Sequence, residues 1–394
     1  MTVPRITGVQ LSEVTAGPLL LLGPSLGTSV DALWSACAAR LAPHFQVVGW
    51  DLPGHGRNRT VGSSFTMAEL AAGVLALAET ALVERGEPGG SFLYAGDSVG
   101  GAVGLQLLLD APGRVAAAAL LCTGARIGDP QTWADRAATV RASGTPAVLA
   151  GSATRWFAPG FLEREPSVGS ALLTSLSDAD DEGYAQVCEA LAGFDVRGRL
   201  GRITAPVLTV AGAFDQVTPP ASLQEIADGV PGATSVVLEG VAHLAPAEAP
   251  AALAALLLRH LLPDPYAAGL AVRRQVLGEA HVDRAVAATT AFTADFQELI
   301  TRYAWGTIWT RPGLDRRSRS LITLTALVAR GHHEELAMHV RAARTNGLTE
   351  DEIKELLLQT AIYCGVPDAN TAFRIAQRVL TEIAAESGTR EENP

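Results

Sequence analysis

The chain has 394 residues, which is long for a single hydrophobic core and favours two or three domains. It is 48% hydrophobic and 18% charged, and it contains no uninterrupted apolar run of about 18 residues that could span a membrane. The formal net charge of −11 argues against a nucleic-acid partner, because contacts to phosphates need a basic surface.

Residues 1–262 alternate between short apolar runs and amphipathic helical stretches, as expected of an α/β domain. The apolar runs are continuous, which predicts strands of a mostly parallel sheet that is covered on both faces. The expected strands are residues 17–23, 45–51, 91–96, 116–122, 206–212 and 234–240. Between about residues 124 and 202 the pattern gives way to helices and loops, which predicts a helical cap.

The sequence Gly96-Asp97-Ser98-Val99-Gly100 lies between a predicted strand and a predicted helix. It is a G-x-S-x-G pattern in the strand–turn–helix context of a nucleophile elbow, and it predicts that Ser98 is a catalytic nucleophile. The alternative is an ordinary turn serine. The helix N-terminus beside the serine would favour the negative charge that develops in acyl transfer.

A serine hydroxyl needs a base to accept its proton, and the base needs an acid to orient it. In this arrangement the acid and the histidine follow the serine in the chain, each in a loop after a later strand. Asp215 and His243 satisfy that order. Glu239 is a competing acid because it is near His243 in sequence, and Asp97 is expected to point away from the imidazole.

Acyl transfer also needs two backbone N–H groups that bind the oxyanion. The N–H of Val99, directly after the nucleophile, and that of Leu26, in the loop after the first long strand, are the candidates. Within the cap, Arg155 and Trp156 of "ATRWFAPGF" are candidates for binding an anionic substrate under an aromatic lid. A cap helix with ordinary packing aromatics would have the same sequence.

Four segments resemble the 3-oxoadipate enol-lactonases of the α/β-hydrolase superfamily: "GPSLGTSVDALW", "DLPGHGRN", "AGDSVGG" and "AGAFDQVTPP". The resemblance implies an α/β-hydrolase domain that hydrolyses a small carboxylated enol-lactone without a cofactor. The chain departs from this family at Pro24, where an asparagine is expected before Ser-Leu-Gly. This departure should leave the Leu26 N–H usable.

Residues 269–394 have helical periodicity and no strand signal, which predicts an all-α domain after a linker at residues 263–268. Asp315 is a predicted N-cap, and Thr349 with Glu352 has the spacing of a capping box.

The histidine-rich segment "HHEELAMH" does not match a zinc-binding helix, because Ala337 stands where His-Glu-x-x-His needs its second histidine. No metal site is therefore predicted. Glu335 and His339 lie four residues apart on one helix face, where the carboxylate could orient the imidazole for proton transfer. An ordinary surface ion pair has the same spacing.

Three long segments of this domain resemble the 4-carboxymuconolactone decarboxylases: "VRRQVLGEAHVDRA", "FQELITRYAWGTIWTRPGLDRRSRSLITL" and "ELAMHVRAARTNGLTEDEIKELLLQTAIYCGVPDAN". Peroxidase-type members of the wider superfamily carry a CxxC pair. No such pair is present in this sequence, which excludes thiol redox chemistry of that kind. Tyr303 is a further departure, since a histidine is expected at that position.

This second resemblance implies a decarboxylation without a cofactor, in which the electrons left by CO2 flow into the lactone carbonyl as a dienolate. On that basis we expect His339 to donate the proton, with Glu335 as its partner. The candidates for binding substrate carboxylates are Arg316, Arg317 and Arg319, which could equally be exposed residues at a helix start.

The two resemblances together predict a bifunctional enzyme of the protocatechuate branch of the 3-oxoadipate pathway, because the decarboxylation product is the lactonase substrate. One alternative is a serine esterase of other specificity whose helical domain only joins subunits, and another is a peroxide-handling protein. Small carboxylated lactones are the expected ligands, and a homo-oligomer formed through the helical domain is expected. No cofactor, nucleic-acid or membrane partner is predicted. Four scattered cysteines and no recognisable signal peptide favour the cytoplasm.

Overall fold

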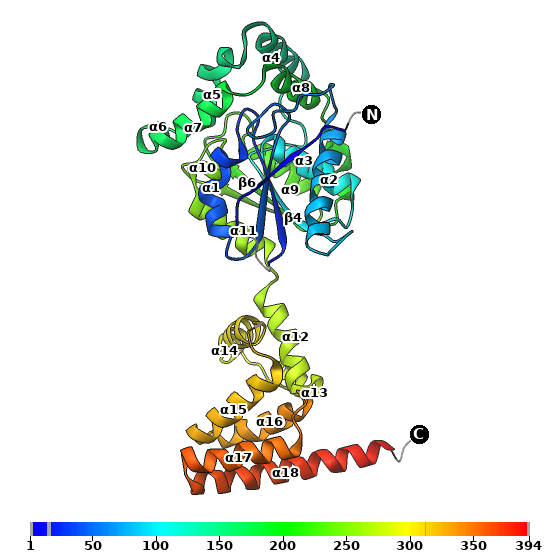
Figure 1. Ribbon diagram of the computed structural model, residues 1–394, viewed down its shortest axis with the longest axis vertical. Helices are drawn as coiled ribbons and strands as arrows, with labels where there is room; N and C mark the ends of the chain where they lie inside the picture. Colours follow the sequence, from blue (N-terminus) through cyan, green and yellow to red (C-terminus); the bar gives the residue numbers. More distant parts are fainter. Residues whose placement is uncertain (1–2, 14–16, 312, 392–394) are drawn as a thin grey trace. The chain divides into compact units, whose positions relative to one another are not determined.

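The computed structural model describes residues 3–13, 17–311 and 313–391. By its internal contacts the chain divides into two compact units, Met1–Leu262 and Pro263–Pro394 (Figure 1). The first unit is an α/β domain and the second is helical, as predicted. Among the described residues, no helix is long and apolar enough to cross a membrane.

The first unit is built on a seven-stranded sheet in the order β1-β3-β2-β4-β5-β6-β7. The strands are β1 (Thr7–Gln10), β2 (Leu19–Gly23), β3 (Gln46–Asp51), β4 (Phe92–Asp97), β5 (Val115–Leu121), β6 (Val207–Gly212) and β7 (Thr234–Leu238). All six predicted strands are present and pair in parallel. Sequence analysis missed β1, a short edge strand that pairs antiparallel with β3.

Helices cover both faces of the sheet, which explains why its central strands are apolar along their whole length. Helices α1 (Val30–Leu41), α10 (Ala245–Glu248) and α11 (Pro250–Leu261) pack together. Helices α2 (Met67–Glu84) and α3 (Val99–Asp110) pack together on the other side of the sheet, and α9 (Pro220–Gly229) packs on β6 and β7 (Figure 1). Strands β2, β3 and β4 are buried throughout, so the main core of this unit lies around them.

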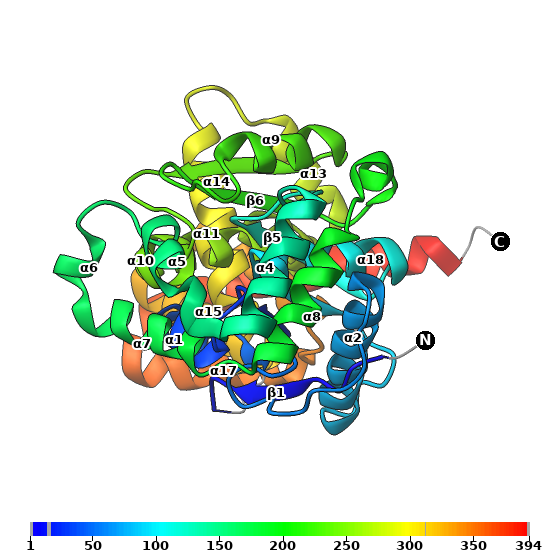
Figure 2. The same ribbon diagram turned by 90° about the horizontal axis from the view of Figure 1, so that it is seen from above.

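A helical cap separates β5 from β6, where the sequence predicts it. It consists of α4 (Pro130–Ser143), η1 (Thr145–Val148), α5 (Leu149–Trp156), α6 (Phe161–Arg164), α7 (Pro166–Ser177), α8 (Asp181–Ala192) and η2 (Arg197–Arg202). Helices α4 and α8 lie side by side in both views (Figures 1 and 2). The cap therefore covers the carboxyl ends of the strands, where the loops after β4, β6 and β7 emerge.

The second unit is helical throughout its described residues. Its elements are α12 (Pro265–Leu277), α13 (Glu279–Ala287), α14 (Ala294–Ile300), the π-helix η3 (Thr301–Ile308), α15 (Arg316–Arg330), α16 (His333–Thr345), α17 (Glu350–Cys364) and α18 (Val366–Glu391). Asp315 caps α15 through the Ser318 N–H, and Thr349 and Glu352 form the predicted capping box. The local sequence therefore determines where these helices begin.

The predicted linker at residues 263–268 is too long. Helix α12 already begins at Pro265, and the Asp264 side chain accepts a hydrogen bond from the Tyr266 N–H. Proline is favoured in the first turn of a helix, because N–H groups there have no partner within the helix and its missing N–H costs no hydrogen bond. The Pro-Asp-Pro sequence is thus a helix start as well as a break between the units.

Candidate active site

Ser98 lies at a sharp turn between β4 and α3, with a backbone φ of +53°. Two glycines permit this turn. A Cβ on Gly96 would lie 2.3 Å from the Gly100 carbonyl oxygen, and one on Gly100 would lie 2.7 Å from the Pro24 oxygen. The Ser98 N–H donates to the Leu121 carbonyl at 2.9 Å. Because of this close packing, the first and last positions of the G-x-S-x-G pattern exclude any side chain.

The structure brings the three predicted catalytic side chains into one hydrogen-bonded chain. The Ser98 hydroxyl lies 2.9 Å from His243 Nε2, and His243 Nδ1 lies 2.8 Å from Asp215 Oδ2. All three residues are buried. The competing acid Glu239 is exposed and forms no hydrogen bond to His243 within the described parts of the chain. This geometry suits a serine nucleophile with a histidine base.

Asp215 is held in the ionised form that a histidine partner requires. Its Oδ1 accepts hydrogen bonds from the N–H groups of Val217 and Thr218, at 2.8 and 3.0 Å, and its Oδ2 accepts one from the Thr218 hydroxyl. Burial acts to raise the pKa of Asp215, but the charge and hydrogen bond of His243 and the two N–H donors outweigh it. The net effect lowers the pKa of Asp215 below its usual value.

The two expected oxyanion donors lie beside the nucleophile. Leu26 lines the same cavity as Ser98 and His243, and Val99 is the first residue of α3. A hydrogen bond from the Gly100 N–H to the Pro24 carbonyl ties the elbow to the loop that carries Leu26, at 2.9 Å. Pro24 thus contributes its carbonyl oxygen here, and its lack of an N–H does not prevent this contact.

Glu248, which sequence analysis did not single out, connects the histidine loop to the cap. Its Oε1 accepts hydrogen bonds from the N–H groups on either side of His243, from Ala242 at 2.9 Å and Leu244 at 3.4 Å. Its Oε2 accepts one from the Ala158 N–H of the cap at 2.8 Å. The His243 N–H also donates to the Trp156 carbonyl at 3.1 Å. The histidine backbone and the end of α5 are therefore fixed to one another.

Asp97 is completely buried beside the nucleophile, and neither of its carboxylate oxygens has a hydrogen-bond partner within the described parts of the chain. Burial, followed by the nearby charges of Asp215 and Glu248, raises the pKa of Asp97 well above its usual value. Asp97 therefore forms no hydrogen bond to the imidazole and is not the acid that orients His243, which is Asp215.

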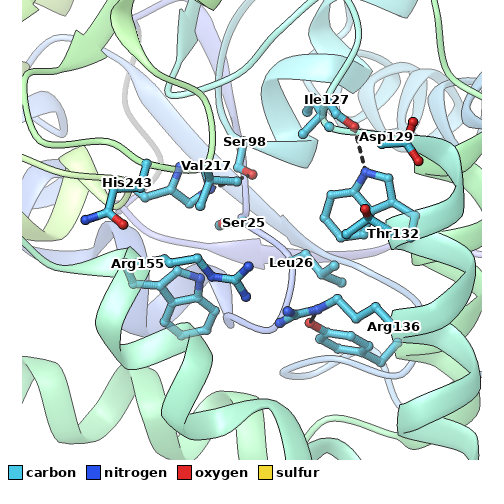
Figure 3. A pocket seen from close by; sticks show the side chains of 15 residues that line it. Ser25, Leu26, Ser98, Ile127, Asp129, Thr132, Arg136, Arg155, Val217 and His243 are labelled. Atoms are coloured by element: carbon cyan, nitrogen blue, oxygen red, sulfur yellow. Dashed lines mark hydrogen bonds between the residues drawn. The ribbon is translucent and has the colours of Figure 1, made fainter.

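A cavity of about 170 Å³ lies between the triad and the cap. Figure 3 shows the guanidinium groups of Arg136 (α4) and Arg155 (α5) pointing into it below Ser98. Arg136 donates to the Tyr184 hydroxyl and the Ser152 hydroxyl, at 2.8 and 2.9 Å. Neither arginine forms an ion pair with a carboxylate of the described residues. Sequence analysis found Arg155 but missed Arg136, which stands in an unremarkable helical stretch.

The electrostatics of this cavity favour an anionic ligand. Burial, followed by the positive charge of Arg136, lowers the pKa of Arg155. Two neighbouring cations without a carboxylate between them repel one another, and a bound anion relieves that repulsion. Trp156 lines the same cavity and is buried, with its ring edge-on to Phe157. This contact fits both an aromatic lid and an ordinary packing aromatic.

In the second unit, His339 lies on α16 and is partly buried. Burial, followed by the positive charge of His281 on α13, lowers the pKa of His339. The negative charge of Glu335 acts in the opposite direction. Glu335 is exposed and forms no hydrogen bond to His339 among the described residues. Glu335 therefore acts on His339 through its charge and does not form the orienting hydrogen bond that the sequence suggested. His281, which sequence analysis did not consider, also acts on His339.

The three arginines expected to bind carboxylates lie at the start of α15 and are already engaged. Arg316 donates to Gln275, Arg317 forms an ion pair with Glu352, and Arg319 donates to the carbonyls of Leu314 and Arg311. These contacts fit the alternative role of exposed helix-start residues. Tyr303, on η3, is 64% exposed. Among the described residues, no group of three or more His, Cys, Asp or Glu side chains is arranged to hold a metal ion.

Comparison with known families assigns each unit separately. The model of the α/β hydrolase fold matches residues 18–250, and that of the carboxymuconolactone decarboxylase family matches residues 294–378. The enol-lactonase structure from Burkholderia xenovorans superposes with a TM-score of 0.61 at 31% identity, covering 65% of this chain and 96% of that one.

Two Acinetobacter baylyi proteins are similar to the two parts of the chain. The 3-oxoadipate enol-lactonase 2 is 35% identical over 248 residues, which is 62% of this chain and 90% of the relative. The 4-carboxymuconolactone decarboxylase is 48% identical over 118 residues, which is 30% of this chain and 88% of the relative. The chain is therefore a fusion of a member of the α/β hydrolase family with a member of the carboxymuconolactone decarboxylase family.

Proposed function

We propose that the chain catalyses two consecutive steps of the protocatechuate branch of the 3-oxoadipate pathway. The helical unit decarboxylates 4-carboxymuconolactone to 3-oxoadipate enol-lactone, and the α/β unit hydrolyses that lactone to 3-oxoadipate. One observation carries the proposal: the two relatives are separate proteins whose reactions follow one another, and this chain joins both families.

In the hydrolysis step, Ser98 attacks the lactone carbonyl while His243 accepts the serine proton, and Asp215 stabilises the imidazolium that results. The N–H groups of Leu26 and Val99 bind the oxyanion. The ring opens when the enol oxygen leaves, His243 returns a proton to it, and the resulting enol tautomerises to the ketone. A water molecule, activated by the same histidine, then releases 3-oxoadipate from the serine ester.

Arg136 and Arg155 supply the specificity for a carboxylated lactone. The substrate keeps one carboxylate outside its ring, and these two arginines are the cations that face the cavity. Arg136 is the better anchor, because Tyr184 and Ser152 fix its orientation, whereas Arg155 donates a hydrogen bond to the Gly151 carbonyl of its own helix. A pre-oriented guanidinium loses less side-chain entropy when the ligand binds.

In the decarboxylation step, the departing CO2 leaves its electron pair to the conjugated lactone carbonyl, and a proton must return to the ring carbon beside that carbonyl. We assign this proton transfer to His339. Burial and His281 favour its neutral form, and Glu335 opposes them. The net effect lowers the pKa of His339, which makes its protonated form a stronger acid and a readier proton donor.

The helical unit is the part through which we expect the chain to form a homo-oligomer. It exposes several large apolar side chains: Phe292, Phe296, Ile362, Tyr363 and Val366. Ile362 and Tyr363 are 80% and 82% exposed, which is unusual for a monomer surface. The location that we propose is the cytoplasm, and the four unpaired cysteines fit a reducing compartment.

A proton NMR time course with 4-carboxymuconolactone tests both activities in one chain. The wild type should yield 3-oxoadipate, and Ser98→Ala should stop at the enol-lactone, because only the second step uses the serine. His339→Ala should leave the carboxylated lactone unchanged and still hydrolyse added enol-lactone. A wild type that consumes no 4-carboxymuconolactone would support the esterase with a helical oligomerisation module instead.

Replacing Arg136 with methionine should weaken binding of the anionic lactone. Loss of a charge-assisted hydrogen bond is worth roughly 10- to 100-fold in KM for the enol-lactone, with a smaller change in kcat. Hydrolysis of the uncharged ester p-nitrophenyl acetate should not change. Arg141→Met is the matched control, since Arg141 is on the same helix but pairs with Glu182 and Glu189. Equal KM values for the two variants would contradict the assignment.

Glu248→Gln should slow hydrolysis of the enol-lactone. Three N–H donors surround the carboxylate, so the amide NH2 of glutamine would face another donor, and kcat should fall by roughly 10-fold or more.

The rate of hydrolysis of added enol-lactone measures this effect. Glu239→Gln is the control, since Glu239 is exposed in the loop before His243. A folded Glu248→Gln enzyme with the kcat of the wild type would contradict this role of Glu248.

The homo-oligomer can be tested by light scattering on the purified chain. The wild type should have a mass that is a multiple of 40.9 kDa. Ile362→Glu with Tyr363→Glu should lower that mass, because charge is poorly accommodated in an apolar interface. A monomeric wild type at micromolar concentration would contradict the proposal.

A further inference from the structure

Arg273, on α12, is a buried cation that the proposed chemistry does not yet use. The residue is only 7% exposed. Nη1 donates to Gln297 Oε1 at 3.1 Å and to Thr301 Oγ1 at 3.3 Å, and both acceptors are neutral. Its Nε is buried without a hydrogen-bond partner, and no carboxylate within the described ranges forms an ion pair with it. Buried guanidinium groups are rarely left without an anion.

A hollow of about 470 Å³ adjoins this arginine. Gln297 and Thr301 also line it, as do Arg302 and Glu298. The last two do not neutralise Arg273, since Arg302 pairs with both Glu298 and Asp264. The hollow therefore presents one unneutralised guanidinium to a ligand, with neutral hydrogen-bonding groups beside it.

The local backbone is built to hold Arg273 in place. Thr301 is the first residue of the π-helix η3, a rare geometry that occurs often at functional sites. Helix α12 approaches η3 backbone to backbone: a Cβ on Gly269 would lie 2.1 Å from the Thr301 oxygen, and one on Gly306 would lie 1.9 Å from the Pro265 oxygen. This contact fixes Arg273 against its two acceptors, so the guanidinium is oriented before any ligand binds.

Arg273 is also electrostatically connected to the proposed proton donor. Burial, and then the positive charges of Arg273 and Arg284, lower the pKa of His281. The charge of His281 in turn lowers the pKa of His339, as the second-largest cause behind burial. Helix α12 packs on both α13 and α16, so the elements that carry the arginine and the two histidines lie next to one another, although neither histidine lines the hollow.

We propose that Arg273 binds a carboxylate of the decarboxylase substrate, namely the carboxylate that is retained in the product. This inference rests on the proposed function of the helical unit. A cation paired with the departing carboxylate would lose its partner's charge as CO2 forms and would oppose the reaction. A cation paired with the retained carboxylate has the same partner in the ground state and the transition state, so its contribution is to binding.

Replacing Arg273 in the full-length chain tests the assignment. Arg273→Ala should raise KM for 4-carboxymuconolactone by roughly 10- to 100-fold with a smaller change in kcat, and Arg273→Lys should lie between it and the wild type. Methylguanidinium in solution should restore part of the loss in Arg273→Ala, which a purely structural role would not allow. Arg274→Ala is the matched control, because the adjacent Arg274 pairs with Glu279 and Asp283.

An unchanged KM in folded Arg273→Ala, or a fall in kcat alone without rescue, would overturn the proposal. If Arg273→Ala does not fold, Arg273→Lys carries the test, and a KM equal to that of the wild type would then overturn it.

Calorimetric titration with adipate separates this proposal from the proposed function. If the wild type does not decarboxylate 4-carboxymuconolactone, the proposed function of the helical unit fails. A binding event that is present in the wild type and lost in Arg273→Ala would still establish a carboxylate site, whereas identical isotherms would overturn it. Binding of adipate at Arg136 would contribute equally to both chains.

Discussion

The left-handed backbone of Ser98 is the constraint on which the hydrolase unit depends. A non-glycine residue in such a conformation costs on the order of 1–3 kcal/mol and persists only where its surroundings fix it. Here the surroundings are three strands. The Ser98 N–H is bonded to the end of β5, its carbonyl accepts from Thr123, and Gly100 donates to the loop after β2. The sheet therefore stabilises the turn that lifts the hydroxyl toward His243.

The position of the triad could be predicted from sequence because parallel strands end at the same edge of a sheet. Once Ser98, Asp215 and His243 are each assigned to the loop after a strand, topology brings them together. Arg136 and Glu248 could not be found in that way. Arg136 depends on a contact with Tyr184 inside the cap, and Glu248 on a contact between the histidine loop and Ala158 of the cap. Both contacts join residues far apart in sequence, and no local pattern marks either residue. Strand β1 was not predicted for a different reason, because it is short and lies at an edge of the sheet.

In the helical unit the sequence was sufficient for the starts of α15 and α17, but it was insufficient for the start of α12 and for side-chain roles. Caps such as Asp315 and the pair Thr349 and Glu352 act within one turn, so their signal is local. Arg273 and Arg274 are adjacent and chemically identical. Only their position around the helix axis separates them, because it directs one toward Gln297 and the other toward Glu279 and Asp283. That distinction requires knowledge of the neighbouring helices.

The attachment of the cap to the histidine loop has a consequence for the catalytic cycle. The Trp156 carbonyl binds the His243 N–H, and Glu248 joins Ala158 to both neighbours of that histidine. Any motion that lifts the end of α5 would break these bonds and release the loop that positions the base. An enzyme with its cap raised would therefore also lack a correctly positioned catalytic base. Ester cleavage and solvent exposure of the site would alternate in time, which protects the serine ester from unproductive encounters while the lid is raised.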